Sequence, residues 1–182
     1  MQGLVVYESM YGNTHVVATA IAEGLREHMQ VTVVPVREAE ESLVTDADVV
    51  VVGGPTHAHG MSHANTRQGA VTAAEKPDSE LVLDAGDDRD AYGFGLREWF
   101  DALPALTTNA AAFDTRADMP AALSGRASKG IARRLRRHGA QVIADPESFF
   151  VTKANHLEPD EESRARQWGQ HLGTLLRASA VS

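Results

Sequence analysis

The densest group of residues that could do chemistry lies between Glu8 and Thr14, directly after an apolar run. Ser9, Asn13 and Thr14 offer neutral hydrogen-bond donors, and Gly12 can turn the chain sharply just before a helical segment begins. The N-terminus of a helix presents unpaired backbone N–H groups and the positive end of the helix dipole, so such a loop can hold a phosphate without a lysine. The segment predicts a site for a phosphate that is bound but not transferred.

Other interpretations of this loop are less favoured. The lysine of the nucleotide-hydrolase loop is absent, and so is the Gly-x-Gly-x-x-Gly turn of NAD-binding folds. Simple helix capping by Ser, Asn or Thr is the plainer interpretation. Capping needs one such residue, whereas this loop has three of them and a glycine, which favours a ligand site.

Five short apolar runs predict the strands that position this loop, at residues 4–7, 31–36, 49–52, 110–113 and 141–144. Their apolar character is continuous rather than alternating, which is typical of parallel strands covered on both faces. Helices are expected between and after them, at residues 14–29, 66–74, 96–106, 126–138 and 161–176. Strands that alternate with helices predict a doubly wound α/β fold, here a single domain over residues 1–182.

Composition narrows the function classes. The chain has 25 acidic and 17 basic residues and a formal charge of -8, which disfavours nucleic acid or an anionic membrane as the main partner. It has no cysteine, so electron chemistry needs a bound cofactor rather than thiols or an iron–sulfur cluster. Residues 1–7 contain no basic stretch followed by a long apolar run, and we therefore expect a cytoplasmic location.

At Ser9, Gly12, Asn13 and Thr14 the sequence resembles the flavodoxin family, whose phosphate loop follows the first strand with Ser or Thr, two further residues and then Gly-Asn-Thr. The likeness extends over residues 4–176. It implies a flavodoxin-like, five-stranded parallel sheet in the order 2-1-3-4-5 with helices on both faces. It also implies flavin mononucleotide (FMN) as the cofactor, bound beyond the carboxyl ends of the strands.

The same resemblance implies which residues contact FMN. The phosphate would lie in the loop after the first strand, and the flavin ring in the loops after the third and fourth strands, where glycines let the backbone approach the ring. The implied cofactor-binding residues are Ser9, Met10, Tyr11, Gly12, Asn13, Thr14, Pro55, Thr56, His57, His59, Gly60, Asp114, Thr115 and Arg116.

One departure from the family concerns the flavin ring, which well-studied flavodoxins hold between aromatic side chains of these two loops. Here the first loop offers His57 and His59, and the second has no aromatic residue. Stacking on the ring is therefore expected to be weaker or different, with Tyr11, Tyr92 or Phe94 as side chains that could reach over it.

Two groups near these loops have alternative interpretations. His57, His59 and His63 could bind a metal, since imidazole is a common zinc ligand, but the same segment has no Asp, Glu or Cys, so loop histidines near a ligand are the simpler interpretation. Arg116 is either an exposed loop cation or a charge that neutralises a reduced flavin or a bound substrate.

The segment 126–138 is unusually basic for an acidic chain. Such a run is most simply a solvated helix face, but it could also dock an acidic redox partner or the phosphates of NADPH. Its cationic residues are Arg126, Lys129, Arg133, Arg134, Arg136 and Arg137.

The resemblance leaves two main functions open. One is an electron-transfer protein in which FMN exchanges electrons with a redox partner protein. The other is an enzyme that takes hydride from NAD(P)H and reduces a quinone or similar acceptor, with the polar segment 77–95 as a lid or a homo-oligomer contact. Within that segment we expect residues 78–93 to be the least ordered.

Two further classes are less favoured. A flavodoxin-like interaction module without cofactor disagrees with the intact phosphate loop. A phosphoacceptor response regulator needs an aspartate where the third strand ends, and that strand ends at Gly53 and Gly54.

Overall fold

The computed structural model describes residues 1–57, 59–84 and 93–180. Its strands are β1 (Gln2–Tyr7), β2 (Gln30–Pro35), β3 (Val49–His57), β4 (Gly60–Met61), β5 (Asn109–Ala117), β6 (Gln141–Val142) and β7 (Glu147–Val151). Its helices are α1 (Asn13–Leu25), α2 (Glu41–Thr45), α3 (Ala64–Ala74), α4 (Leu96–Ala102), α5 (Ala121–Ser124), α6 (Ala127–Arg137) and α7 (Glu161–Ala180), with a 3-10 turn at η1 (Val36–Glu38).

The parallel strands lie in the order β2-β1-β3-β5-β6, which confirms the predicted order 2-1-3-4-5 and the flavodoxin-like fold. Two strands were not predicted. The short strand β4 pairs antiparallel with β3, and β7 pairs parallel with the later part of β5. The fifth position is thus shared by β6 and β7, with Pro146 between them, a residue that has no backbone N–H to donate to a ladder.

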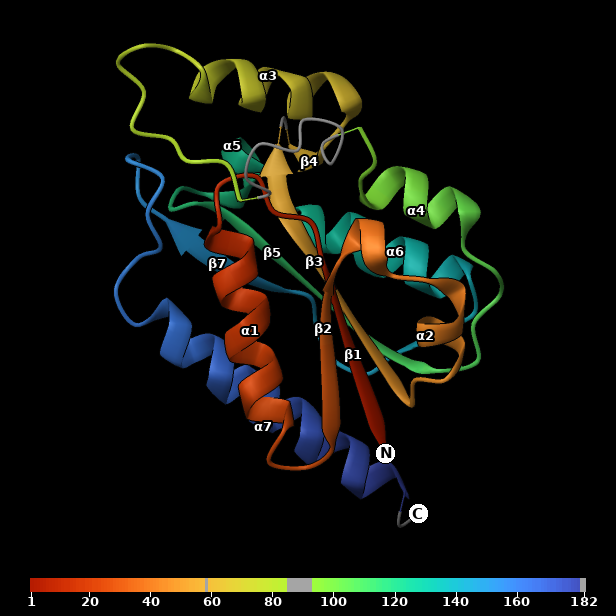
Figure 1. Cartoon of the computed structure of the whole chain (residues 1–182). Helices are drawn as coiled ribbons and strands as arrows, with labels where there is room; N and C mark the ends of the chain where they lie inside the picture. The colour runs from red at the N-terminus through yellow and green to blue at the C-terminus, as the bar shows by residue number, and fades with distance from the viewer. Residues whose placement is uncertain (58, 85–92, 181–182) are drawn as a thin grey trace.

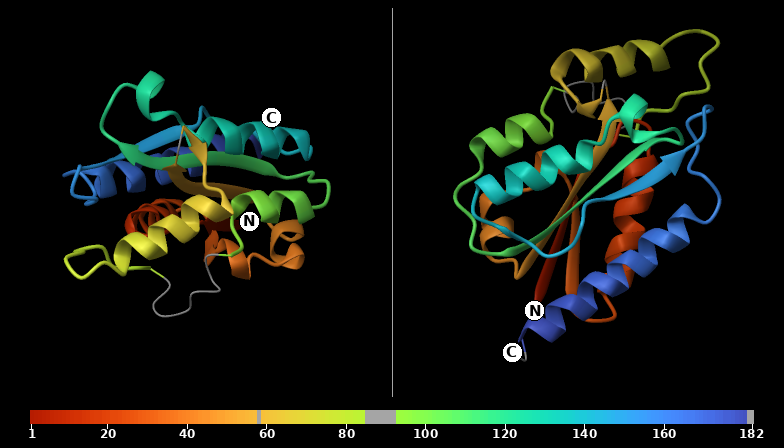
Figure 2. Two further views of the ribbon diagram at one scale, coloured as in Figure 1. Left: turned by 90° about the horizontal axis from the view of Figure 1, so that it is seen from above. Right: turned by 180° about the vertical axis from the view of Figure 1, so that it is seen from behind.

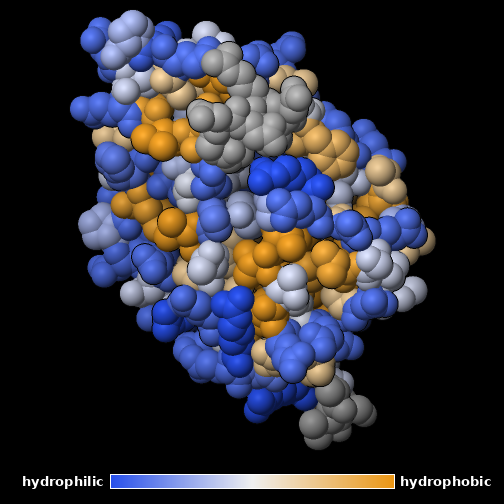
Figure 3. Space-filling view, viewed as in Figure 1, coloured by the Kyte–Doolittle hydropathy of each residue, from blue (hydrophilic) through white to orange (hydrophobic). Residues whose placement is uncertain are grey.

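Helices cover both faces of the sheet. In Figure 1, α1 and α7 lie on one side and α2, α4 and α6 on the other, and the second view in Figure 2 shows the same two layers from behind. Alternate residues of β1 enter two separate cores: Val5 and Tyr7 pack with α1 and α7, and Leu4 and Val6 pack with α4 and α6. The strand β2 forms one edge of the sheet, and the apolar colour on the face drawn in Figure 3 gathers around it.

Two glycines let α1 and α7 touch through their backbones. A Cβ added at Gly24 of α1 would lie 2.0 Å from the carbonyl oxygen of Arg166, and one added at Gly169 of α7 would lie 2.1 Å from that of Ile21. No side chain fits at either position, because both distances are far below van der Waals contact. The close crossing fixes α1, whose first residues form the predicted phosphate loop.

The structure corrects two predicted strand ends. The strand β3 continues to His57 and β5 to Ala117, so Pro55 and Thr115 lie opposite each other in the sheet rather than in loops. Strand pairing uses backbone groups, whereas an apolar run marks only the part of a strand that helices cover on both faces. The polar ends of β3 and β5 therefore escaped the sequence pattern.

The predicted helices are present with shifted ends, while α2, α5 and η1 are too short to give a periodic pattern. The segment expected to be least ordered, residues 78–93, is described only as far as Asp84 and again at Gly93. Residues 85–92 lie outside the described part of the chain.

Candidate functional site

The phosphate loop ends in an uncapped helix start. Gly12 is the N-cap of α1 in a left-handed conformation (φ 89°), which favours glycine, and no side chain caps this helix. The backbone N–H of Val16 bonds to the carbonyl of Gly12, so the N–H groups of the first turn, at Asn13, Thr14 and His15, have no intrahelical acceptor. The capping interpretation is therefore wrong for α1, and these N–H groups are available for an anion.

The polar side chains of the loop tie it to neighbouring elements. The Ser9 hydroxyl accepts a hydrogen bond from the backbone N–H of the loop glycine (3.1 Å). The hydroxyls of Thr14 and Thr115 lie 2.7 Å apart and are buried, and the Asn13 side-chain amide donates to the carbonyl of Asn155 (2.8 Å). The loop is thus held against β5 and the turn after β7 by neutral groups.

A cavity of about 270 Å³ opens beside this loop, where β3, β5 and β7 end. It brings together the predicted residues Met10, Tyr11, Asn13, Thr14, Pro55, Thr56, His57, Thr115 and Arg116. It is also lined by Ala117, Val151, Thr152, Lys153 and Asn155, which the sequence analysis missed. Most of these additional residues belong to the end of β7 and the turn after it. No apolar run had indicated that β7 lies beside β5.

Several predicted residues lie elsewhere. His59 and Gly60 line a separate groove, and Ser9 and Gly12 shape the phosphate loop without lining the cavity. Asp114 is fully buried and accepts a hydrogen bond from the backbone N–H of Ser128 (2.7 Å) at the start of α6. Its side chain alternates with that of its neighbour along β5 and so points to the α6 face of the sheet, away from the cavity.

Thr56 combines two roles in this arrangement. It lines the cavity, and its hydroxyl accepts a hydrogen bond from the backbone N–H of Ala127 (2.9 Å) at the start of α6. The end of β3 is therefore fixed to α6 directly beside the cavity.

Arg116 is half-buried rather than an exposed loop cation. Its Nη1 donates to the carbonyl of Met119 (2.7 Å) and the hydroxyl of Ser124 (2.9 Å), and its guanidinium lies 4.7 Å from the centre of the Phe150 ring. Its Nε is buried without a partner, and no carboxylate among the described residues lies within ion-pair distance of it. An uncompensated positive charge thus borders the cavity.

In the described part of the chain, the aromatic rings that line the cavity are those of Tyr11 and His57. The Tyr11 hydroxyl donates to the carbonyl of Ala70 (3.1 Å), which holds the ring against α3. Phe94 lines other hollows and not this one, and Tyr92 lies outside the described residues. Among the described residues, Tyr11 and His57 are therefore the side chains placed to stack on a flavin.

Burial lowers the pKa of His57 below its ordinary value of 6.5, against an opposing effect of the charge on Glu8. We expect an NMR titration of the His57 ring protons to give a pKa below 6.5. Between the folded-state pKa and 6.5, the unfolded chain binds more protons at this histidine than the folded protein does. The free energy of unfolding therefore falls as the pH falls from 6.5, and this loss is complete below the folded-state pKa. The His57→Gln variant should lose this part of the pH dependence, and a folded-state pKa at or above 6.5 would contradict the prediction.

A buried polar network that the sequence analysis missed includes Glu8 and Arg67, which line a separate hollow. Arg67 of α3, 1% exposed, donates to the Ser62 hydroxyl (3.0 Å), and Ser62 in turn donates to the carboxylate of Glu8. Arg67 also donates to Glu98 (2.9 Å), and Glu8 accepts from the backbone N–H of Leu96 (2.8 Å). The network joins the end of β1 to the segment after β4 and to α3 and α4.

The hydrogen bonds of this network act on Glu98. Burial alone would raise the pKa of its carboxyl, but hydrogen bonds from the backbone at its own position, from Arg67 and from Gly95 outweigh it and hold the pKa below its usual value. Glu98 is therefore charged at neutral pH and compensates Arg67.

The three histidines proposed as metal ligands occupy different places. His57 lines the cavity, His59 lines the separate groove, and His63 precedes α3 as its N-cap. The described residues contain no group of three side chains of the metal-binding types placed to hold an ion.

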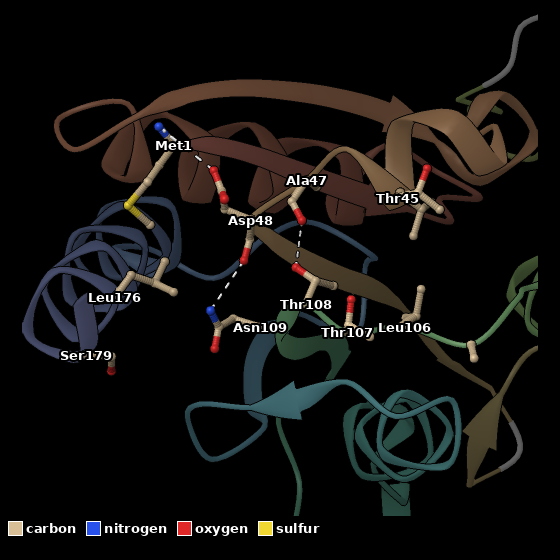
Figure 4. A pocket seen from close by; sticks show the side chains of 12 residues that line it. Met1, Thr45, Ala47, Asp48, Leu106, Thr107, Thr108, Asn109, Leu176 and Ser179 are labelled. Atoms are coloured by element: carbon tan, nitrogen blue, oxygen red, sulfur yellow. Dashed lines mark hydrogen bonds and ion pairs between the residues drawn. The ribbon is translucent and has the colours of Figure 1, made fainter. Parts of the chain in front are cut away.

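A cavity of about 520 Å³ lies at the opposite ends of the strands, where the strands begin (Figure 4). Its polar groups bond to one another: the Thr108 hydroxyl donates to the carbonyl of Ala47 (2.7 Å) and the Asn109 amide to that of Asp48 (3.4 Å). Ligands of parallel α/β sheets bind beyond the carboxyl ends of the strands, so the cavity of about 270 Å³ is the candidate site.

Comparison with known proteins supports the fold. The sequence model of the flavodoxin family matches residues 5–113 of this chain. No curated protein matches the chain significantly. Within the described part of the chain, no helix is both long and apolar enough to span a membrane.

Similar solved structures include two flavodoxins and one larger protein. A flavodoxin from the domain Archaea has a TM-score of 0.64 and 18% identity, over 97% of this chain and 99% of its own. Oxidised flavodoxin 1 from Bacillus cereus has a TM-score of 0.62 and 19% identity, over 98% of each chain. Rubredoxin oxygen:oxidoreductase from Desulfovibrio gigas has a TM-score of 0.61 and 19% identity, over 100% of this chain but 37% of its own.

Proposed function

This chain belongs to the flavodoxin family, and from that premise we propose that it binds FMN in the cavity beside the phosphate loop and transfers electrons to or from a partner protein. The observation that carries the proposal is the uncapped start of α1, which opens at the crevice where a doubly wound sheet binds its ligand. FMN supplies the redox chemistry when it is bound, and the protein binds it, orients it and excludes water.

The residues around the uncapped helix start fit a terminal phosphate. The first-turn N–H groups at Asn13, Thr14 and His15 can donate to its oxygens, and the Thr14 hydroxyl can turn from Thr115 to do the same. The exposed Lys153 lines the same cavity and adds a positive charge. Asp84 also lies against this loop: its side chain pairs with His15 (3.2 Å), and its backbone N–H donates to the carbonyl of Met10 (2.9 Å).

The residues at the ends of β3 and β5 fit the flavin ring. Tyr11 and His57 offer rings for stacking, and the uncompensated guanidinium of Arg116 favours negative charge in the cavity, as on a reduced flavin. His57, kept neutral by burial, adds no second positive charge.

The size of the cavity favours a carrier over an enzyme. At about 270 Å³ it lies just below the range of about 300–1,000 Å³ that is usual for ligand pockets. A cavity of this size offers little enclosed space for a second substrate beside a bound cofactor. This supports exchange with a partner protein over direct reduction of a quinone by NAD(P)H.

Titration of the purified chain with FMN tests the proposal. At a free FMN concentration of 100 times the Kd, stability should rise by about 2.7 kcal/mol, a shift in Tm of about 5–11 °C. Absence of flavin binding contradicts the proposal. If FMN binds and NADPH alone bleaches its absorbance, the protein is an NAD(P)H-dependent oxidoreductase rather than a carrier.

The Thr14→Ala variant should bind FMN about 5- to 30-fold more weakly, because it lacks one hydroxyl donor worth about 1–2 kcal/mol. The matched control is Thr72→Ala, since Thr72 is exposed on α3 and its hydroxyl bonds within that helix. Affinity is measured by quenching of flavin fluorescence, and unchanged affinity of Thr14→Ala would place the phosphate elsewhere.

A further inference from the structure

We propose that the basic groove along α6 docks an acidic electron-transfer protein next to the flavin site. This inference rests on the proposed function and names the class of partner. The groove, of about 630 Å³, is lined by His59, Gly60, Met61, Arg97, Ala121, Ala122, Arg126, Lys129, Gly130, Arg133, Arg134 and Arg137. None of these lining residues is acidic, although the chain carries a formal charge of -8.

The positive charges of the groove are largely uncompensated. Lys129, Arg133 and Arg137 are exposed, and their spacing of four residues places them along one side of α6. None of the three has a carboxylate within ion-pair distance among the described residues, whereas Arg134 pairs with Asp101 (3.0 Å).

Arg97 adds a fixed cation to the wall of the groove. Its Nε and Nη2 donate to the carbonyls of Ser62 (2.8 Å) and Met61 (3.0 Å), which holds the guanidinium in place. Burial lowers the pKa of Arg97, and the nearby charges of Arg134 and Arg67 lower it further against the effect of Glu98 and Glu8. Like charges crowd here, and an anionic partner surface would relieve that repulsion.

The hairpin formed by β3 and β4 separates the groove from the proposed flavin site. In the pairing of β3 with β4, Thr56 is opposite Met61 and His57 opposite Gly60. The two β3 residues line the cavity, and the two β4 residues line the groove. Paired strands are separated by about 5 Å, so a partner seated in the groove would lie close to a bound flavin.

The spread of the charges favours a protein over a small anion. Arg126 and Arg137 are eleven positions apart, which spans about 16 Å along the helix, farther than one phosphate or diphosphate reaches. A row of cations on an otherwise acidic chain also orients an approaching acidic protein before contact.

Calorimetric titration of the full chain with a plant-type [2Fe–2S] ferredoxin, used as the acidic probe, tests the inference. Binding should be detectable at about 0.01 M ionic strength and weaken at about 0.15 M, because salt screens exposed charges. The variant Lys129→Glu/Arg133→Glu/Arg137→Glu should bind at least about tenfold more weakly at low salt. Cytochrome c, a basic probe, should not bind better to the wild type than to this variant.

A matched control separates the effect of charge in the groove from the effect of the net charge of the chain. The variant Arg26→Glu/Lys76→Glu/Arg177→Glu reverses three exposed cations outside the groove and changes the net charge equally. It should weaken ferredoxin binding less than about threefold. Equal weakening by both variants, or no binding of ferredoxin to the wild type at low salt, overturns the inference.

Two further measurements keep the proposals distinct. FMN affinity should be the same in wild type and groove variant, and the ferredoxin titration is run with and without FMN, so failure of flavin binding and failure of docking are seen separately. Titration with 2′,5′-ADP covers the alternative ligand. If the wild type binds it and the groove variant does not, the groove is a nucleotide site and the protein-docking inference is wrong.

Discussion

Replacing Arg67 by methionine should lower the free energy of unfolding by about 3–5 kcal/mol. The guanidinium is 1% exposed and bonds to Ser62, Glu98 and the carbonyl of Gly93. Without it, the buried carboxylate of Glu8, 5% exposed, loses the cation that reaches it through Ser62, although the charge of Arg97 still acts on it. Glu98 lies near the surface and can be hydrated, so the cost comes mainly from Glu8.

Urea unfolding followed by circular dichroism measures this loss. The control is Arg166→Met, because Arg166 is exposed on α7 and pairs with Glu23 at the surface, where an ion pair contributes at most about 1 kcal/mol. Adding Glu8→Gln to Arg67→Met should recover part of the loss, since it removes the uncompensated charge. Equal, small effects of the two arginine variants would mean that the network does not stabilise the fold.

Replacing Phe149 by alanine should cost about 3–5 kcal/mol of stability, as for other fully buried phenylalanines. Phe149 lies on β7, and its ring packs edge-on against those of Phe113 and Trp168. These contacts hold β7 beside β5 and so place Lys153 and Asn155 at the cavity. FMN affinity should therefore fall together with stability.

Thermal unfolding with and without FMN separates the two effects. The control is Phe94→Ala, because Phe94 is 39% exposed and its removal leaves no buried cavity. It should change stability by less than about 1 kcal/mol. If Phe149→Ala destabilises the chain but leaves FMN affinity intact, the turn after β7 does not contribute to the site.

The apolar runs were sufficient to predict where the main strands lie, and the resemblance to flavodoxins supplied their order. Both depend on short stretches of sequence: the apolar runs mark the buried part of each strand, and the segment that carries the resemblance includes Gly12, which turns the chain just before α1. The face of the sheet to which each side chain points was harder to predict. Asp114 and Thr115 are neighbours in sequence, but alternation along β5 sends one to α6 and the other to Thr14, and this required the true strand end.

Long-range partners were beyond a local pattern. The α3 segment that contains Arg67 is polar and gave no sign that this arginine is buried, because its burial depends on Glu8, far away along the chain, and on Ser62. In the same way, the turn after β7 reaches the phosphate loop through the bond between Asn13 and Asn155, and no feature near either asparagine indicates it.

The crossing of α1 and α7 at their glycines means that the candidate site can be completed only late in the synthesis of the chain. The helix α1 packs against the sheet on one side and against α7 on another, and this second partner is made only more than a hundred residues after α1. At about 5–20 residues per second, α1 waits on the order of ten seconds before α7 can cover the side that carries Gly24. We therefore expect the start of α1 to be held in its final position, and able to keep an anion there, only after α7 has been synthesised and has packed against it.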